Sequence, residues 1–246
     1  MPIFDNYFKK LYQRTMEQAY GSAESAIVDA MQNGGKILDC GCSHGHMYDQ
    51  LSSAVDIALD NYYGVEWNTE LVKLCNEKGI HATQHDLNNA LPYEDGTFRC
   101  VFALSVLEHL LFSCRFMRES ARVLEKGGTL VLLTPNISTL FTIAQLMIGK
   151  MPSSGPHPDS LLLLENQNTI KVSNPDIISD VESDRPEHRH LIIYSFRVLK
   201  TYLKLLGFTD IQGYGFGLYP FPNFMQPLLE NIDPYHCHQM VFIAKK

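Results

Sequence analysis

Short apolar runs alternate with longer amphipathic stretches between residues 36 and 135. Five apolar runs are typical of buried strands: KILDCG (36–41), YYGVEW (62–67), HATQHD (81–86), CVFALS (100–105) and TLVLLT (129–134). Three segments with apolar residues at three-to-four spacing predict helices: HGHMYDQLSSAVD (44–56), NTELVKLCNEKG (68–79) and RFMRESARVLEKGG (115–128). Gly79 and Gly127 lie where glycines commonly end such helices. Strict alternation predicts an α/β fold with a doubly wound parallel sheet, whose ligands bind beyond the carboxyl ends of the strands.

The flanks of this region follow other patterns. Residues 1–33 predict an N-terminal helical cap, made of two short helices broken near Gly21. After Pro135, the run ISTLFTIAQLMIGKM predicts an apolar helix at the start of a 137–187 insertion or lid that is rich in Pro, Ser, Asn and Asp. A helix from about Ser195, ended by Gly207, and two strand candidates, TDIQGYGFG and HQMVFIAKK, complete one expected domain over residues 1–246.

Composition narrows the classes of protein. The chain has 246 residues, 45% of them hydrophobic, which suffices for one large core. No apolar stretch reaches the ~20 residues of a membrane span, and the first residues do not resemble a signal peptide, so we expect a cytoplasmic protein. The formal charge of −7 and the lack of a dense basic patch argue against nucleic acid as a partner. We expect all six cysteines to be free thiols: Cys40, Cys42, Cys75, Cys100, Cys114 and Cys237.

The stretch KILDCGCSHGHM (36–47) carries the most specific pattern. A dinucleotide-binding G-x-G-x-x-G would need glycine where Ser43 and His46 stand, and no Gly-Lys-Ser/Thr ending of a phosphate loop is present. The cysteines and histidines here lack the distant second pair of a structural zinc site, so we predict no metal at this turn. What remains is a strand ending in an acid and a glycine-lined turn, where Gly41 and Gly45 allow close backbone approach.

The residues Asp39, Gly41, Ser43 and Gly45 resemble motif I of the class I S-adenosylmethionine-dependent methyltransferases, Asp/Glu-x-Gly-x-Gly-x-Gly, with Ser43 in place of the middle glycine. The resemblance covers roughly residues 34–136 and 188–246. It implies a Rossmann-like doubly wound sheet of seven strands with an antiparallel last strand, QMVFIAKK, and S-adenosylmethionine as the cofactor.

The resemblance also implies roles for later residues. Glu66 would accept hydrogen bonds from both ribose hydroxyls, and Asp86 would receive the adenine amino group, with Leu87 offering a backbone contact. Trp67 could stack on the adenine. The complete candidate set for cofactor binding is Asp39, Gly41, Cys42, Ser43, Gly45, Glu66, Trp67, Asp86, Leu87 and Ser105.

Methyl transfer to a hydroxyl or amine requires alignment of the acceptor and removal of a proton. Histidine is the natural base near neutral pH, and the candidates, in order, are His109, His188 and His190. Each could instead be a helix cap or a surface histidine. Glu108 and His109 together with His188 resemble the E-x-x-E-H metal set of the ubiquinone-pathway O-methyltransferases and the small-RNA 2′-O-methyltransferases. Because Ser105 replaces the first glutamate, we predict no bound metal.

The acceptor is expected to be a small molecule. The apolar part of the insertion, including Leu161–Leu164, could line its pocket, as could the aromatic residues that follow the sixth strand: Tyr214, Phe216, Tyr219, Phe221 and Phe224. The same residues could serve core and lid packing. The sequence therefore predicts O- or N-methylation of a small molecule. The competing hypotheses are a metal-assisted O-methyltransferase, a non-catalytic methyltransferase-like subunit that binds a protein partner, and a NAD-dependent enzyme.

Overall fold

Seven strands form one mixed sheet in the order β3-β2-β1-β4-β5-β7-β6. The computed structural model describes residues 2–152, 154–157 and 189–246, with side chains from Tyr7 onward. The strands are β1 (Ile37–Cys40), β2 (Tyr62–Glu66), β3 (His81–Gln84), β4 (Phe98–Leu104), β5 (Leu124–Pro135), β6 (Thr209–Phe216) and β7 (Gln239–Lys245). Strands β1 to β5 are parallel, and β7 runs antiparallel to both β5 and β6. The predicted Rossmann-like sheet with an antiparallel last strand is confirmed.

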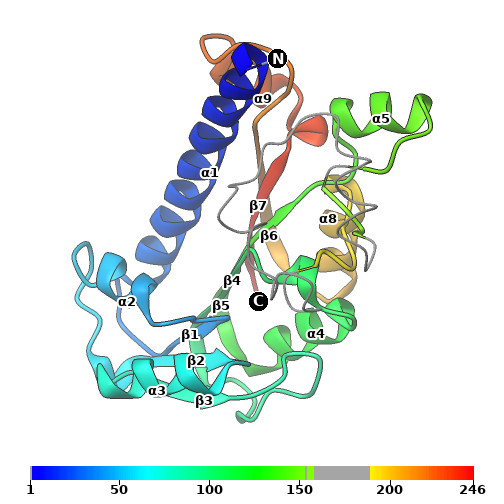
Figure 1. Cartoon of the computed structure of the whole chain (residues 1–246). Coiled ribbons are helices and arrows are strands. Elements are labelled where there is room, and N and C mark those ends of the chain that lie inside the picture. Colours follow the sequence, from blue (N-terminus) through cyan, green and yellow to red (C-terminus); the bar gives the residue numbers. More distant parts are fainter. Residues whose placement is uncertain (1, 153, 158–188) are drawn as a thin grey trace.

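Helices cover both faces of this sheet (Figure 1). One face packs against α1 (Pro2–Met31), α2 (His46–Leu51) and α3 (Thr69–Glu77). The other face packs against α4 (Ser113–Val123) and α8 (Phe196–Leu205). Two further helices, α5 (Leu140–Met147) and α9 (Gln226–Ile232), follow β5 and precede β7. No helix among the described residues is long and apolar enough to cross a membrane.

The two helical layers are possible because the central strands are apolar on both faces. In β4, Phe102 belongs to the cluster under α1, whereas its neighbours Val101 and Ala103 belong to the cluster under α4 and α8. In β5, Val131 belongs to the cluster under α1, and Leu132 belongs to the cluster under α4 and α8. Successive side chains of a strand point to opposite faces, so a continuous apolar run marks a strand that is buried on both sides.

The N-terminal region differs from the prediction of two short helices. α1 is a single helix that passes through Gly21 without a break. Its buried residues, Ala19, Ala23, Ala26, Ile27 and Ala30, recur at helical spacing and pack on the sheet. A glycine inside a helix costs roughly 1 kcal/mol, and the packing of this apolar face outweighs that cost.

Two predicted helix ends are also wrong. α2 ends at Leu51 because the hydroxyls of Ser52 and Ser53 bond back to the carbonyls of Asp49 and Gln50, which competes with continued helix. α4 ends at Val123, before Gly127. Gly127 lies inside β5, where its N–H donates to the carbonyl of Lys246 (2.9 Å). The predicted helix ends at Gly79 and Gly207 are confirmed, since α3 and α8 each end within two residues of the glycine.

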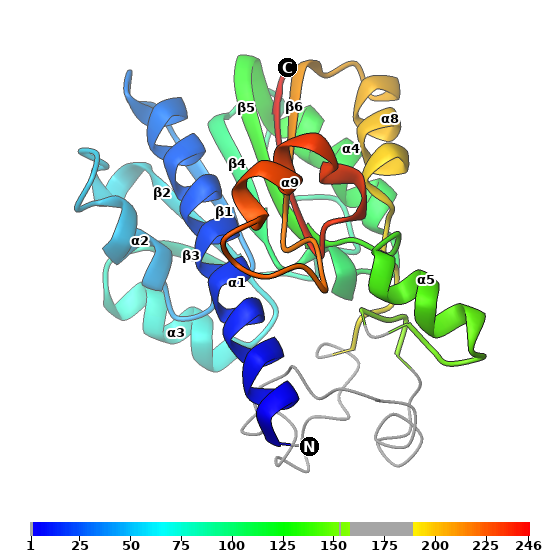
Figure 2. The ribbon, with the colours of Figure 1, turned by 90° about the horizontal axis from the view of Figure 1, so that it is seen from above.

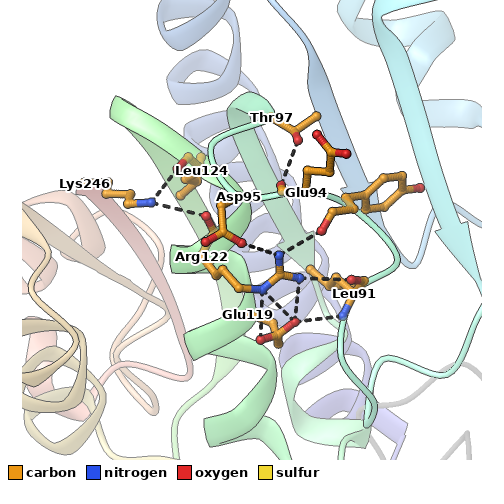
Figure 3. A network of polar contacts seen from close by, with 9 residues as sticks. Leu91, Glu94, Asp95, Thr97, Glu119, Arg122, Leu124 and Lys246 are labelled. Atoms are coloured by element: carbon orange, nitrogen blue, oxygen red, sulfur yellow. Dashed lines mark hydrogen bonds and ion pairs between the residues drawn. The ribbon is translucent and has the colours of Figure 1, made fainter.

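One arginine joins the end of α4 to the loop between β3 and β4 (Figure 3). The Arg122 guanidinium donates to Glu119 and Asp95 (2.8 Å each) and to the carbonyl of Leu91 (3.0 Å). The hydrogen bond from Arg122 lowers the pKa of Glu119. Lys246 adds a bond to the carbonyl of Arg122 (3.3 Å), which ties the end of β7 to the same place. The network fixes the sheet at the end opposite to the carboxyl ends of the parallel strands.

The six cysteines are free thiols, as predicted. Cys42 and Cys75 approach each other to 3.8 Å between sulfur atoms, and both are buried. Burial raises the pKa of each thiol, so both stay protonated at neutral pH.

The continuity of α1 can be tested at Gly21. An added Cβ at this position meets no atom within 4 Å. Gly21→Ala should therefore raise the free energy of unfolding by about 0.5–1 kcal/mol in urea titrations. Gly207→Ala is the control: the site is equally open, but its φ of +89° is a left-handed conformation, so alanine should lower stability by about 1 kcal/mol. A loss of stability in Gly21→Ala would contradict an unbroken helix.

Candidate functional site

The predicted cofactor residues gather at one edge of the sheet. Strands β3, β2, β1 and β4 are neighbours and run parallel, so their carboxyl ends lie side by side. Asp39, Glu66, Asp86 and Ser105 lie at or directly after these four ends. This edge, at the crossover between β1 and β4, is where ligands bind in open α/β sheets.

The turn after β1 requires residues with positive φ. Gly41 (φ 85°) and Gly45 (φ 77°) adopt left-handed conformations, and a Cβ on either would lie 2.6 Å from Val106 or 2.5 Å from Ile80. Ser43 also has a positive φ (48°), in the position where motif I has its middle glycine. The backbone N–H of Ser43 donates to the Glu66 carboxylate (3.0 Å), which holds the turn in this conformation.

Glu66 therefore already has two backbone partners. One carboxylate oxygen accepts the Ser43 N–H, and the other accepts the Asn68 N–H (3.0 Å). The same carboxylate thus ties the turn after β1 to the start of α3. A carboxylate has about four lone-pair sites, so two remain for a ligand.

Asp39 is buried in the floor of this edge. Asp39 is 3% exposed, and its side chain accepts a hydrogen bond from the Tyr62 hydroxyl (2.7 Å). Burial raises the pKa of Asp39 to about 7, although the Tyr62 hydrogen bond opposes the shift. Asp39 therefore keeps its proton to a higher pH than an exposed aspartate does.

The residues after β3 form a compact polar turn. Asp86 accepts the backbone and side-chain N–H groups of Asn88 (2.9 Å each), and Leu87 is buried. Trp67, directly after β2, is 57% exposed. Asp86 and Trp67 thus lie just beyond the ends of the neighbouring strands β3 and β2.

Ser105 connects the end of β4 to α1. It has a positive φ of 57°, and its hydroxyl accepts a hydrogen bond from Tyr20 (3.2 Å). Another α1 residue, Tyr12, lies against the ring of His238 (5.7 Å between ring centroids). Burial raises the pKa of both tyrosines, with the Glu108 carboxylate contributing in the same direction. α1 therefore closes one side of the strand-end edge with two neutral phenols.

Glu108, His109 and His190 form a cluster beyond the end of β4. One ligand-type atom from each residue lies within 4.8 Å of the other two. Glu108 is 2% exposed and accepts a hydrogen bond from the Thr134 hydroxyl (3.0 Å). Burial raises the pKa of its carboxyl group to about 7. The cluster combines one carboxylate and two imidazoles, a donor set that suits divalent transition metals.

The tautomers of the two histidines follow from their partners. His109 Nδ1 lies 3.1 Å from the carbonyl of Arg189, and His190 Nδ1 lies 2.6 Å from the carbonyl of Ser154. A carbonyl only accepts, so each Nδ1 must carry the proton and each lone pair lies on Nε2. Burial lowers the pKa of His190 to about 3, so this ring is neutral at physiological pH.

Of the three predicted histidines, the structure brings His109 and His190 together, while His188 lies outside the described residues, as do Leu161–Leu164. Of the aromatic residues, Tyr219 is buried and packs against His238 (5.2 Å between centroids), whereas Phe224 is largely exposed. The sequence reasoning did not find Tyr12, Tyr20, Tyr62 or His238. Only the apolar periodicity of residues 19–30, which predicts a sheet-facing helix, could have indicated that α1 reaches the site.

Comparison with known proteins decides the family. A profile of the methyltransferase domain matches residues 12–212, most of the chain. The chain belongs to the class I S-adenosylmethionine-dependent methyltransferases. Its cofactor is accordingly S-adenosylmethionine.

Individual relatives of this methyltransferase are distant. It is 25% identical over 150 residues to 27-O-demethylrifamycin SV methyltransferase of Amycolatopsis mediterranei. This alignment covers 52% of this chain and 54% of the relative. It is 32% identical over 107 residues to ajmaline N-methyltransferase of Rauvolfia serpentina, covering 40% and 35%. The alignments thus span about half or less of the curated relatives' length.

A solved structure extends the likeness to the whole fold. A methyltransferase of Thermotoga maritima, described as a possible histamine N-methyltransferase, superposes with a TM-score of 0.56 at 14% identity, covering 99% of this chain and 98% of that chain. At this identity the match shows that the two chains share a fold.

The burial of Asp39 predicts a pH dependence of stability. An aspartate titrates near 3.8 when unfolded, whereas the folded value is about 7, so the folded state holds the proton more tightly. Between about pH 4 and 7 only the unfolded chain releases this proton, so the contribution of Asp39 to wild-type stability falls as pH rises. Asp39→Asn has no titratable group at this position. The difference in the free energy of unfolding, wild type minus variant, should therefore decrease across this pH range and level off above it.

Tyr62→Phe serves as the control for the Asp39 experiment. Loss of the hydroxyl removes the bond that favours the carboxylate, so the decrease should extend to higher pH. A difference between wild type and Asp39→Asn that stays constant with pH would mean that Asp39 titrates normally in the fold.

Proposed function

We propose that this methyltransferase transfers the methyl group of S-adenosylmethionine to an oxygen or nitrogen atom of a small molecule. The observation that carries the proposal is the position of His109, which lies partly buried beside Glu108 and His190 just beyond the end of β4, with its Nδ1 held by the Arg189 carbonyl. The names of the two relatives, 27-O-demethylrifamycin SV methyltransferase and ajmaline N-methyltransferase, support a small-molecule acceptor.

In this proposal the strand-end residues hold the cofactor. The two remaining lone-pair sites of Glu66 accept the ribose hydroxyls, while Trp67 stacks on the adenine. Asp86 receives the adenine amino group, and Leu87 contributes its backbone. The close backbone of the turn, from Gly41 through Cys42 and Ser43 to Gly45, lies against the methionine part of the cofactor, with Asp39 below it and Ser105 opposite.

His109 is the proposed base. Its Nδ1–H is held by the Arg189 carbonyl, so the ring is oriented and Nε2 can accept the proton that the acceptor loses. His190, with a pKa near 3, is too weak a base for this step at neutral pH and instead shapes the pocket. His188 stays a candidate from the sequence alone.

A second candidate function is metal-assisted O-methylation. The cluster of Glu108, His109 and His190 supports it, because both imidazoles are oriented by backbone carbonyls in the way that metal-binding histidines usually are. A divalent cation there would polarise an acceptor hydroxyl and lower its pKa. The resemblance to the ubiquinone-pathway group belongs with this candidate, although Ser105 still replaces that group's first glutamate.

The base hypothesis predicts a separation of binding and turnover. His109→Ala should lower methyl transfer roughly 100-fold or more while S-adenosylhomocysteine binds with wild-type affinity. The acceptor for this assay is first isolated from cell extract by transfer of a labelled methyl group. His81→Ala is the matched control, because His81 is exposed at the opposite end of β3 and should leave turnover unchanged. Equal turnover in both variants would remove His109 from the mechanism.

The metal hypothesis predicts a ligand-dependent change in thermal unfolding. Zn²⁺ or Mn²⁺ alone should raise the unfolding temperature of the wild type, and Glu108→Gln or His109→Ala should abolish that shift without changing the shift caused by S-adenosylhomocysteine. A metal shift that survives both substitutions would place the cation elsewhere. If S-adenosylhomocysteine binds but no extract accepts a methyl group, the non-catalytic subunit becomes the better hypothesis.

A further inference from the structure

Large exposed apolar side chains gather on three segments at one end of the molecule. These segments are the start of α1, α5 with the turn that follows it, and the loop between β6 and α9. Met147 and Phe224 are each 84% exposed, and Ile148 is 69% exposed. We call the following residues the apolar end: Tyr7, Ile143, Leu146, Met147, Ile148, Met151 and Phe224.

Side-chain contacts connect the three segments. Phe8 of α1 packs against Phe141 of α5 (6.3 Å between ring centroids) and against Tyr219 of the loop (6.4 Å). Tyr7 also donates from its hydroxyl to the carbonyl of Pro220 (3.4 Å). Figure 1 places the start of α1, α5 and the loop at the top of the molecule, and Figure 2 looks down on this end. The apolar side chains therefore belong to one end of the fold.

The charge of this end is opposite to that of the chain. The start of α1 (2–10) and the segments 140–152 and 218–225 contain three lysines, Lys9, Lys10 and Lys150, and one acidic residue, Asp5. The whole chain has a formal charge of −7. Lys9 and Lys10 are exposed. Basic groups beside an exposed apolar surface are complementary to a partner that has an apolar interior and an anionic surface.

We propose that the apolar end rests on an anionic lipid bilayer. Met147, Ile148 and Phe224 enter the boundary between head groups and acyl chains, and the lysines contact lipid phosphates. A second copy of this chain is a poorer partner, because a symmetric contact would bring like-charged lysines together. The contact is peripheral, in keeping with the lack of a spanning helix among the described residues.

The surface lies next to the methyl-transfer site. Ser154, three residues after Met151, accepts the Nδ1–H of His190 through its carbonyl, and His157 stacks on the same ring (4.8 Å between centroids). The chain that leaves the apolar end thus leads directly to the Glu108, His109 and His190 cluster. If the proposed function holds, an acceptor dissolved in the bilayer reaches the cluster from this side. Membrane binding itself does not depend on that function.

The test is co-sedimentation with vesicles of phosphatidylcholine alone or mixed with phosphatidylglycerol. Wild-type protein should bind the mixed vesicles, and binding should weaken in high salt. The double variant Met147→Glu/Ile148→Glu should lower binding at least about tenfold. Leu205→Glu is the matched control: Leu205 is 77% exposed but is the last residue of α8, near the Thr209 end of β6 and away from the apolar end, so its substitution should have no effect.

A second pair of variants isolates the charge. Lys9→Gln/Lys10→Gln should lower binding to mixed vesicles by about fivefold for each charge, whereas Lys73→Gln/Lys126→Gln, at exposed lysines elsewhere, should leave it unchanged. All variants should keep the thermal shift with S-adenosylhomocysteine, which shows that they fold. Absence of wild-type binding to mixed vesicles, equal binding to both vesicle types, or a dimer that Met147→Glu/Ile148→Glu dissociates without lipid would each overturn the proposal.

Discussion

The Glu66 carboxylate is the interaction on which the strand-end edge depends. It accepts the N–H of Ser43 and that of Asn68, so one side chain fixes both the turn after β1 and the start of α3. Without it, a non-glycine residue at φ 48° in this turn would keep its backbone strain and lose the charged bond that offsets it. The turn and the end of β2 therefore form one unit. A ligand that binds Glu66 binds a side chain whose position is fixed by the motif I turn.

Burial sets the chemistry of the same edge. Asp39, Glu108 and His190 are all shifted toward their neutral forms, and the first cause in each case is desolvation. Tyr12 and Tyr20 are shifted in the same sense. The neutral imidazole of His190 and the neutral phenols do not repel a sulfonium cofactor and can still accept or donate hydrogen bonds. The carboxyl groups of Asp39 and Glu108 titrate close to physiological pH, so the charge of the edge depends on pH.

The strand segments and motif I could be predicted from the sequence because they rest on local patterns. Continuous apolar runs indicate strands that are buried on both faces, and the positions of Gly41 and Gly45 reflect backbone angles that other residues avoid. The contacts of Tyr20 with Ser105 and of Tyr12 with His238 could not be read in this way, since the partners are 85 and 226 residues apart. The length of α1 was misjudged because Gly21 weakens a helix locally, while packing on the sheet decides the outcome. His190 lies beside Glu108 and His109 because the neighbouring Leu191 N–H donates to the Glu108 carbonyl and His109 bonds to the Arg189 carbonyl, and these long-range contacts are not visible in any local residue pattern.

The position of α1 has a consequence for how the chain folds. This helix comes first in the sequence, yet it packs on β4, β5 and β7, and β7 is the last strand. During synthesis its apolar face therefore lacks much of its partner surface until β7 has emerged. Such pairing of distant segments is characteristic of slow folding, with apolar surface exposed in the meantime. Since Tyr20 and Tyr12 come from this helix, the strand-end edge is complete only when α1 has packed on these strands.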